Sequence, residues 1–302
     1  MKYNISSEFG FIRHFAPSLN PVFLRLASVG MNLLPKGLNK NKLLDISKHS
    51  VICRDGKSIK IYVIKPKDID NKVLPCIVYY PGGGFVFKPA PYHYRNAMLY
   101  AEKTRSVVIL VEYRLSYNTP FNTPLNDAYD AYNFVLNNSE NLNIDKSHIT
   151  IAGDSAGAYL ALNTIVQLNS NNLPLPAKMM LIYPVIDSLS NTKSMLEYVD
   201  TPVWNAKLNK KMWQIYKKGN ALDSIMDAKD LSYIPLTYIE TSEFDCLRDE
   251  GIEFYNKISK FNKNNILYNT KNTMHGYDFV KNSTITQESL NKRIEFLNMK
   301  EK

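Results

Sequence analysis

The fold is decided by residues 149–157, which read Ile149-Thr150-Ile151-Ala152-Gly153-Asp154-Ser155-Ala156-Gly157. A short apolar run typical of a buried strand ends at Gly153, and a helical pattern begins near Ser155. The serine stands in a Gly-x-Ser-x-Gly arrangement, which is typical of a nucleophile carried on a sharp turn from strand to helix. Glycines on both sides let the turn close. The N-terminus of the helix would favour negative charge developing beside Ser155.

The motif alone is not decisive. At an average usage of about 7% for each residue, Gly-x-Ser-x-Gly arises by chance in roughly one 300-residue chain in ten. The alternative interpretation is that Ser155 serves only as the N-cap of the helix. Whether Ser155 is a nucleophile or only a helix cap therefore depends on the pattern of the residues around the motif.

On both sides of this motif, short apolar runs alternate with helical segments, which indicates an α/β fold built on a mostly parallel sheet. Continuous apolar runs are typical of strands buried on both faces. The expected strands are 74–80, 106–113, 149–153, 179–183, 236–241 and 266–268. The expected helices are 92–104, 124–137, 155–167, 249–261 and a last one from about 287.

Two segments do not follow this alternation. Residues 1–48 are expected to be helical and partly apolar, forming a cap, and about 188–223 is expected to be a second cap segment inserted between two strands. The catalytic domain is therefore predicted to span 49–302. Residues 50–66 are predicted to form a β-hairpin around the Asp55-Gly56 turn.

A second motif follows the strand 74–80 directly. It reads Pro81-Gly82-Gly83-Gly84-Phe85. Glycines expose backbone N–H groups, and such groups stabilise the oxyanion that forms in acyl transfer. A flexible loop is the alternative. A phosphate-binding loop is disfavoured because no Gly-Lys-Ser/Thr follows.

Five motifs in this order resemble the hormone-sensitive-lipase-like family of α/β-hydrolases, in its bacterial esterase branch. The resemblance covers about residues 50–280 and implies an eight-stranded sheet flanked by helices and covered by a helical cap. The motifs are Pro81-Gly82-Gly83-Gly84-Phe85, Glu112-Tyr113-Arg114-Leu115, Gly153-Asp154-Ser155-Ala156-Gly157, Asp245-Cys246-Leu247-Arg248-Asp249-Glu250-Gly251 and His275-Gly276-Tyr277.

The resemblance implies a role for each matching residue. Ser155 falls on the nucleophile, Asp245 on the acid and His275 on the base of a catalytic triad. The N–H groups of Gly83, Gly84 and Ala156 fall on the oxyanion hole. The supporting positions are Pro81, Gly82, Phe85, Gly153, Asp154 and Gly157.

The order of residues along the chain supports these assignments. In this fold the nucleophile is followed by the acid and then by the base, and His275 is the only histidine after Ser155. Asp245 follows the predicted strand 236–241. Glu243 and Asp249 are alternatives for the acid; Asp249 is expected to cap the next helix, and Glu243 to be solvated or structural.

Two positions depart from the family pattern. Pro81 stands where the family usually has histidine, and proline's fixed φ is expected to replace the bracing by that side chain. Ser116-Tyr117-Asn118 stands where the family usually has Ala-Pro-Glu, which leaves the shape of the pocket open.

Composition excludes several classes of function. The net charge is +9, but the lysines are spread along the chain, so no nucleic-acid partner is expected, and the lysine-rich run 207–218 is interpreted as a solvated helix face. Three cysteines without a Cys-x-x-Cys pair argue against disulfides and a zinc site. No signal peptide is recognised at the start of the sequence, so a cytoplasmic location is expected.

The expected function is hydrolysis of short- to medium-chain carboxylic esters, with a small-molecule ester as partner and no metal or organic cofactor. One alternative is a membrane-surface lipase that uses the apolar residues 21–34 as an adhering lid. Another is a non-catalytic ligand-binding member of the fold. A homodimer is left open.

Overall fold

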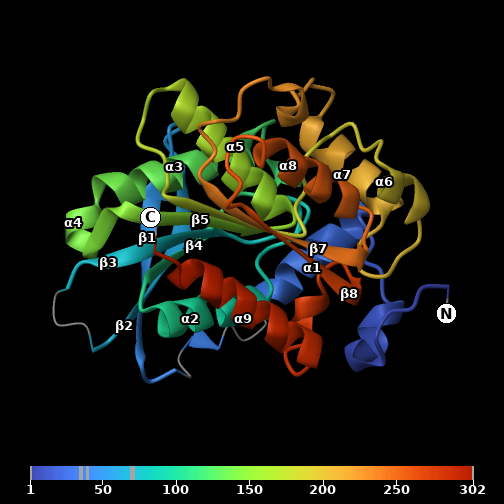
Figure 1. Ribbon diagram of the computed structural model, residues 1–302, viewed down its shortest axis with the longest axis horizontal. Coiled ribbons are helices and arrows are strands. Elements are labelled where there is room, and N and C mark those ends of the chain that lie inside the picture. The colour runs from blue at the N-terminus through green and yellow to red at the C-terminus, as the bar shows by residue number, and fades with distance from the viewer. Residues whose placement is uncertain (1, 34–36, 39–40, 69–71, 301–302) are drawn as a thin grey trace.

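An eight-stranded, mostly parallel sheet forms the centre of the computed structural model, which describes residues 2–33, 37–38, 41–68 and 72–300 (Figure 1). The strand order is β1-β2-β4-β3-β5-β6-β7-β8, and only the pairs β1–β2 and β2–β4 are antiparallel. The strands are β1 (Leu44–Ile52), β2 (Ser58–Pro66), β3 (Leu74–Tyr80), β4 (Val107–Glu112), β5 (Ile144–Asp154), β6 (Lys178–Ile182), β7 (Leu236–Phe244) and β8 (Ile266–Met274). This confirms the predicted fold class.

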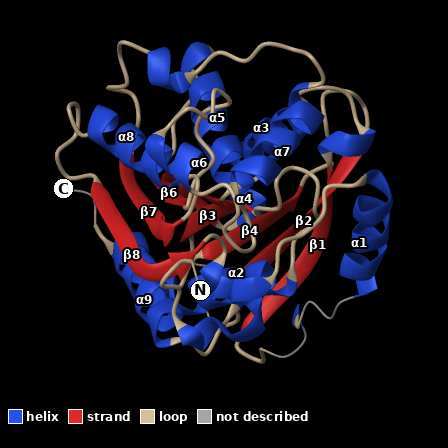
Figure 2. Cartoon of the chain, turned by 90° about the vertical axis from the view of Figure 1, so that its right-hand side faces the viewer, coloured by secondary structure: helices blue, strands red, loops and turns tan. Residues whose placement is uncertain are grey.

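Helices cover both faces of the sheet (Figure 2). One face carries α3 (Thr123–Asn137), α5 (Ala156–Ser170) and α8 (Arg248–Ile258), and the other carries α2 (Pro91–Thr104) and α9 (Thr284–Asn298). Successive side chains of β3 therefore enter different cores, with Val78 and Tyr80 on the first face and Ile77 and Tyr79 on the second. Because both faces of the central strands are buried, β3, β4 and β6 consist mostly of apolar residues, as their sequences indicated.

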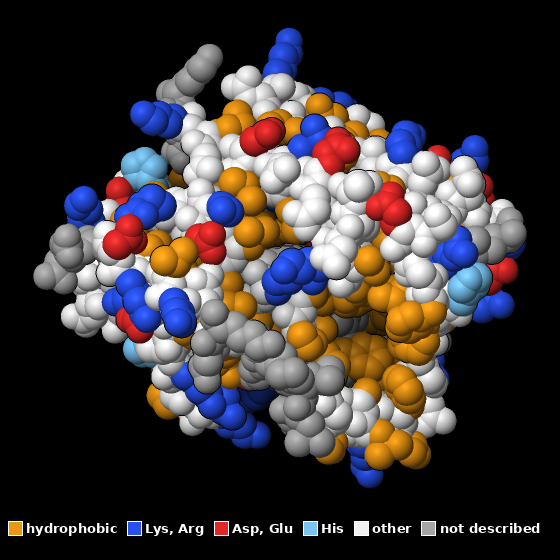
Figure 3. Space-filling view, turned by 90° about the horizontal axis from the view of Figure 1, so that it is seen from below, with side chains coloured by type: hydrophobic (Ala, Val, Ile, Leu, Met, Phe, Trp, Pro, Cys, Tyr) orange, Lys and Arg blue, Asp and Glu red, His pale blue; other side chains and the backbone are white. Residues whose placement is uncertain are grey.

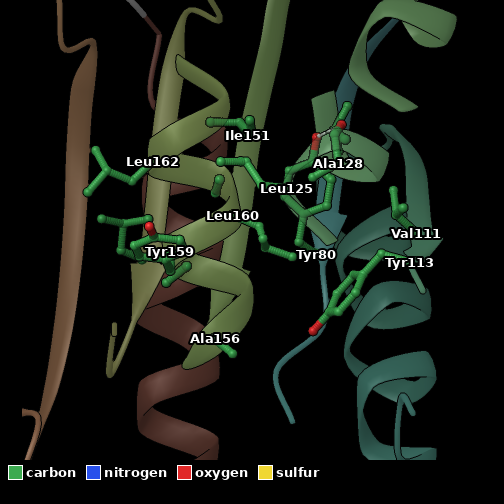
Figure 4. Close-up of a cluster of buried hydrophobic side chains, with 14 of the residues drawn as sticks. Tyr80, Val111, Tyr113, Leu125, Ala128, Ile151, Ala156, Tyr159, Leu160 and Leu162 are labelled. Atoms are coloured by element: carbon green, nitrogen blue, oxygen red, sulfur yellow. Dashed lines mark hydrogen bonds between the residues drawn. The ribbon is translucent and has the colours of Figure 1, made fainter. Parts of the chain in front are cut away.

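The core beneath the Gly-x-Ser-x-Gly turn is tightly packed (Figure 4). Ile151 of β5 and Leu160 of α5 pack in the same buried cluster as Leu125 and Ala128 of α3. The hydroxyl of Tyr80 donates a hydrogen bond to the carbonyl of Ala128, with an oxygen–oxygen distance of 2.8 Å. Strand β3, helix α3 and helix α5 are thus fixed relative to one another under the turn.

The expected hairpin is confirmed, with β1 and β2 joined through the turn at Asp55 and Gly56. Its first strand begins earlier than predicted, at Leu44, within the segment that was expected to be helical. Strands β5 and β8 also extend beyond the apolar runs that predicted them. Their added residues alternate or are polar, so a search for continuous apolar runs could not find them.

Two segments cover the carboxyl ends of the strands. The first contains the 3₁₀ helix η1 (Ser7–His14) and α1 (Pro21–Leu33); the second contains α6 (Lys193–Glu197) and α7 (Ala206–Lys217). They are joined where the amide of Val203 donates a 2.6 Å hydrogen bond to the carbonyl of Phe15. Residues 34–36 and 39–40 of the predicted cap lie outside the described residues.

The three cysteines are buried, and none forms a disulfide. Within the described ranges, no helix is both long and apolar enough to cross a bilayer.

Candidate active site

Ser155 occupies a strained turn between β5 and α5. Its φ of 54° and ψ of −121° lie in a region that residues other than glycine rarely adopt. The turn is held by two backbone hydrogen bonds, from Ser155 N to Ile182 O (2.8 Å) and from Val185 N to Ser155 O (3.1 Å). A Cβ atom on Gly157 would overlap the carbonyl of Tyr80, so only glycine lets α5 start this close to β3.

The structure brings the three side chains expected from the sequence into one hydrogen-bonded chain. Nε2 of His275 lies 2.9 Å from Oγ of Ser155, and Nδ1 lies 2.7 Å from Oδ2 of Asp245. Oδ1 of Asp245 also accepts a 3.0 Å hydrogen bond from the amide of Leu247. All three residues are buried, with 5%, 0% and 5% of Ser155, Asp245 and His275 exposed. This is the geometry of a nucleophile, base and orienting acid.

The two alternative acids lie elsewhere. Oε2 of Glu243 accepts a hydrogen bond from the amide of Asn272, so Glu243 has a structural contact, as expected. The expectation that Asp249 caps helix α8 is wrong: Leu247 stands at the N-cap, and Asp249 lies inside the first turn. Its carboxylate accepts a hydrogen bond from Ser194 N (2.8 Å), which ties α8 to α6, and another from Nε of the neighbouring Arg248 (2.7 Å). The first helical turn begins earlier than the sequence indicated.

The glycine loop runs along the cavity beside Ser155. Three successive residues have positive φ: Gly83 (127°), Gly84 (57°) and Phe85 (60°). The amides of Gly83 and Gly84 donate to no acceptor in the described part of the chain, and both residues line the same cavity as Ser155 and His275. Ala156 opens helix α5, where first-turn N–H groups have no intrahelical acceptor. The three amides are therefore available to an anion at Ser155.

Side chains and backbone brace this loop from outside. The hydroxyl of Tyr113 donates a 2.7 Å hydrogen bond to the carbonyl of Pro81. The amide of Ser116 donates to the carbonyl of Phe85 at 2.8 Å, so the unusual residues after Leu115 still support the glycine loop. Phe85 is fully buried, and its ring packs against aromatic rings that include those of Tyr159, Trp213 and Tyr216.

Asp154 forms a buried polar cluster directly under the loop. Its carboxylate accepts hydrogen bonds from Tyr79 (2.6 Å) and Tyr92 (2.9 Å) and lies 3.1 Å from Nε2 of His93. Burial opposes ionisation, but the interactions with His93 and the two hydroxyls outweigh it and hold the pKa of Asp154 below its ordinary value. A Cβ on Gly82 would overlap this carboxylate. The glycine loop therefore rests on Asp154.

A second buried network lies beneath His275. Arg293 of α9, 1% exposed, binds Glu240 of β7 through Nη2 (2.6 Å) and Asp278 through Nη1 (2.8 Å). Asp278 also accepts a 2.7 Å hydrogen bond from Tyr183, whose ring meets the ring of His275 edge-on at 4.7 Å. The ion pairs link α9 to the strand before Asp245 and to the loop after His275.

Sequence reasoning missed both clusters. His93 and Arg293 are separated from Asp154 and Glu240 by long stretches of chain, and no motif joins them. The only signal was that Asp154 stands in the nucleophile motif, and it did not identify partners.

The site opens into a cavity of about 590 Å³. Its walls are almost entirely apolar and aromatic, and Phe23, Phe87, Trp204 and Phe279 are among them. No cluster of His, Cys, Asp and Glu suited to a metal ion occurs in the described part of the chain.

Comparisons with known proteins agree with this geometry. The family model for the alpha/beta hydrolase fold matches residues 77–279. Carboxylesterase NlhH of Mycobacterium tuberculosis is 28% identical over 212 residues, which are 68% of this chain and 66% of NlhH. Esterase LipI of the same species is 26% identical over 214 residues, or 69% of this chain and 67% of LipI. The chain thus spans about two thirds of the length of these curated relatives.

Solved structures extend the likeness over nearly the whole chain. An esterase of the archaeon Pyrobaculum calidifontis superposes with a TM-score of 0.81 and 27% identity, covering 94% of this chain and 92% of its own. A bacterial heroin esterase gives a TM-score of 0.85 at 24% identity, covering 99% and 98%, and it supports the fold. The chain therefore belongs to the alpha/beta hydrolase fold family, and the resemblance of its motifs to the hormone-sensitive-lipase-like, bacterial esterase branch is confirmed.

Proposed function

We propose that this protein is a serine carboxylesterase that works through an acyl-enzyme. The observation that carries the proposal is the buried chain Ser155–His275–Asp245, with distances of 2.9 and 2.7 Å, beside the free amides of Gly83 and Gly84. The names of NlhH, LipI and the P. calidifontis enzyme, all esterases, support the same activity. We assign the segment before β1 and about 188–223 to the cap, and residues 44–302 to the catalytic domain, which therefore begins at Leu44 and not at residue 49 as the sequence predicted.

In the first half of the reaction, His275 takes the proton from Ser155 as Oγ attacks the acyl carbonyl. The amides of Gly83, Gly84 and Ala156 stabilise the oxyanion of the tetrahedral intermediate. His275, oriented by Asp245, then protonates the departing alcohol and leaves an acyl-Ser155 ester. Water, deprotonated by His275, attacks this ester; the bond to Oγ then breaks, His275 returns the proton to Ser155, and the carboxylic acid is released.

The cavity favours uncharged esters of short to medium chain length. Its walls are apolar, and burying an ionised group there without a partner would be costly. A volume of about 590 Å³ falls in the range of small-molecule sites, which supports a small ester as the substrate.

The test measures hydrolysis of p-nitrophenyl esters from acetate to palmitate. We expect turnover by the wild type with a preference for the shorter esters, and a loss on the order of 10⁶-fold in Ser155→Ala. Ser289→Ala, which changes a buried serine of α9, is the matched control and should keep wild-type rates. Binding of these esters without turnover by the wild type would instead indicate a non-catalytic ligand-binding protein.

A further inference from the structure

Helix α1 is apolar on two of its sides. Phe23, Ala27 and Met31 line the active-site cavity at helical spacing. Val22, Leu26 and Val29, also at helical spacing, point away from it and remain 65%, 67% and 59% exposed. A helix on the surface of a water-soluble protein ordinarily turns a polar face to solvent. The outer side of α1 is therefore suited to an apolar partner.

Neighbouring aromatic residues extend this surface to the mouth of the cavity. Phe11 is 79% exposed and Phe15 is 49% exposed, and both also line the cavity. Figure 3 shows hydrophobic side chains gathered around a hollow on the face seen from below. We call Phe11, Phe15, Val22, Leu26 and Val29 the α1 face. Exposed apolar patches of this kind mark sites that bind a protein or a membrane.

The charge of the same segment favours a membrane over a protein as the partner. Residues 9–44 contain five Lys and Arg residues and no Asp or Glu. Of the five, Arg25 and Lys42 are exposed, and Arg25 makes no ion pair within the described part of the chain. The exposed Arg25 gives this apolar helix a positive charge, and an apolar surface that carries positive charge matches the interface of an anionic lipid bilayer, where acyl chains lie beneath negative headgroups.

We propose that the α1 face binds the surface of anionic lipid membranes and turns the mouth of the active site toward the bilayer. The helix lies in the interface, because no described helix is long and apolar enough to span it. Lipophilic esters then enter the cavity from the lipid phase. This inference goes beyond the proposed function, since membrane binding requires no turnover.

The experiment measures binding to vesicles by flotation, using Ser155→Ala so that hydrolysis does not alter the lipids. Vesicles of phosphatidylcholine with phosphatidylserine are compared with vesicles of phosphatidylcholine alone, at low and high salt. We expect flotation with the anionic vesicles and weaker flotation at high salt. The triple change Val22→Ser, Leu26→Gln, Val29→Ser should weaken binding by at least about tenfold, because these side chains insert into the interface.

Matched control variants distinguish binding through the α1 face from non-specific hydrophobic adsorption. Ile52→Ser, Val73→Ser and Leu196→Gln together remove three aliphatic side chains of similar exposure on other elements, and binding should stay at the wild-type level. Arg25→Gln should reduce binding and its dependence on salt. If the triple variant does not fold, the single variant Leu26→Gln replaces it in the flotation experiment. Thermal melts check that each variant is folded.

Three outcomes would overturn the proposal. One is no flotation of the starting protein with anionic vesicles at low salt. Another is equal binding by the α1-face and control variants, which would assign binding to the net positive charge. The third is a dimer in sedimentation equilibrium that the triple variant abolishes while vesicles are not bound, which would make the α1 face an interface between two copies. Ester hydrolysis by the wild type tests the proposed function separately.

Discussion

The floor of the active site and its cap differ in almost every physical respect. On the floor, Ser155, Asp154, Asp245 and His275 stand at or just beyond strand ends, are at most 5% exposed, and have their polar groups paired. Helix α1, which we assign to the cap, is apolar and partly exposed, and the segment before it is joined to the second cap segment by the hydrogen bond from Val203 to Phe15. We infer that the sheet positions the groups that react, while the cap controls which molecules reach them. Changes on the floor should lower kcat, and changes in the cap should act on KM.

The largest effect after loss of the nucleophile is expected from the acid. Asp245→Asn should lower kcat by roughly 10⁴-fold, because the amide stabilises the wrong tautomer of the base. Asp249→Asn is the matched control, since the Asp249 carboxylate contacts Ser194 and Arg248 and no triad residue within the described ranges; it should lower the melting temperature and leave kcat near wild type. Steady-state kinetics on a short-chain ester measure both. The reverse pattern would mean that the acid is wrongly assigned.

A smaller decrease in kcat is expected on substitution of Pro81, the residue directly before the glycine loop. Pro81→Ala should lower kcat by about 10-fold with a smaller change in KM, because looser amides stabilise the transition state less well. Pro81→His should be less damaging than Pro81→Ala. Wild-type kcat in Pro81→Ala, with normal melting, would show that Tyr113 and Asp154 hold the loop without the proline ring.

In the cap, Phe23 tests the other half of the comparison. Phe23→Ala should raise KM for medium-chain esters by about 10-fold, because a large apolar contact is lost. Its effect on kcat, and on acetate esters, should be small. Kinetics over the ester panel measure this, and a drop in kcat with unchanged KM would contradict the division of roles between cap and floor.

The smallest effect concerns Glu250, a buried carboxyl of α8 behind the floor. Burial, with a lesser contribution from Asp187 and Asp245, raises its pKa well above the ordinary value. Because the pKa of Glu250 is higher in the folded than in the unfolded state, the neutral carboxyl contributes its full share of the free energy of unfolding below the unfolded pKa of about 4.3. This contribution is lost as pH rises toward the folded pKa. Glu250→Gln cannot ionise, so its melting temperature relative to wild type should increase with pH. A difference independent of pH would contradict a neutral Glu250.

The sequence predicted what depends on local pattern. The strands around Ser155, the hairpin at Asp55-Gly56 and the three residues now hydrogen-bonded at the site follow from apolar runs, turn chemistry and motif order. The contacts of Asp154 with His93 and of Arg293 with Glu240 did not, because they join segments that only the folded sheet brings together. The two apolar sides of α1 also needed the structure, since sequence alone does not show which residues line the cavity.

Covalent labelling identifies the nucleophile of this protein without relying on a substitution. The protein is treated with an organophosphate ester, residual esterase activity is measured, and the modified peptide is identified by mass spectrometry. We expect one label per chain, on Ser155, in proportion to lost activity, and no label in Ser155→Ala, because this hydroxyl lies 2.9 Å from Nε2 of His275 in the same cavity as the amides of Gly83 and Gly84. Stoichiometric labelling of another serine, with activity lost in step, would contradict it.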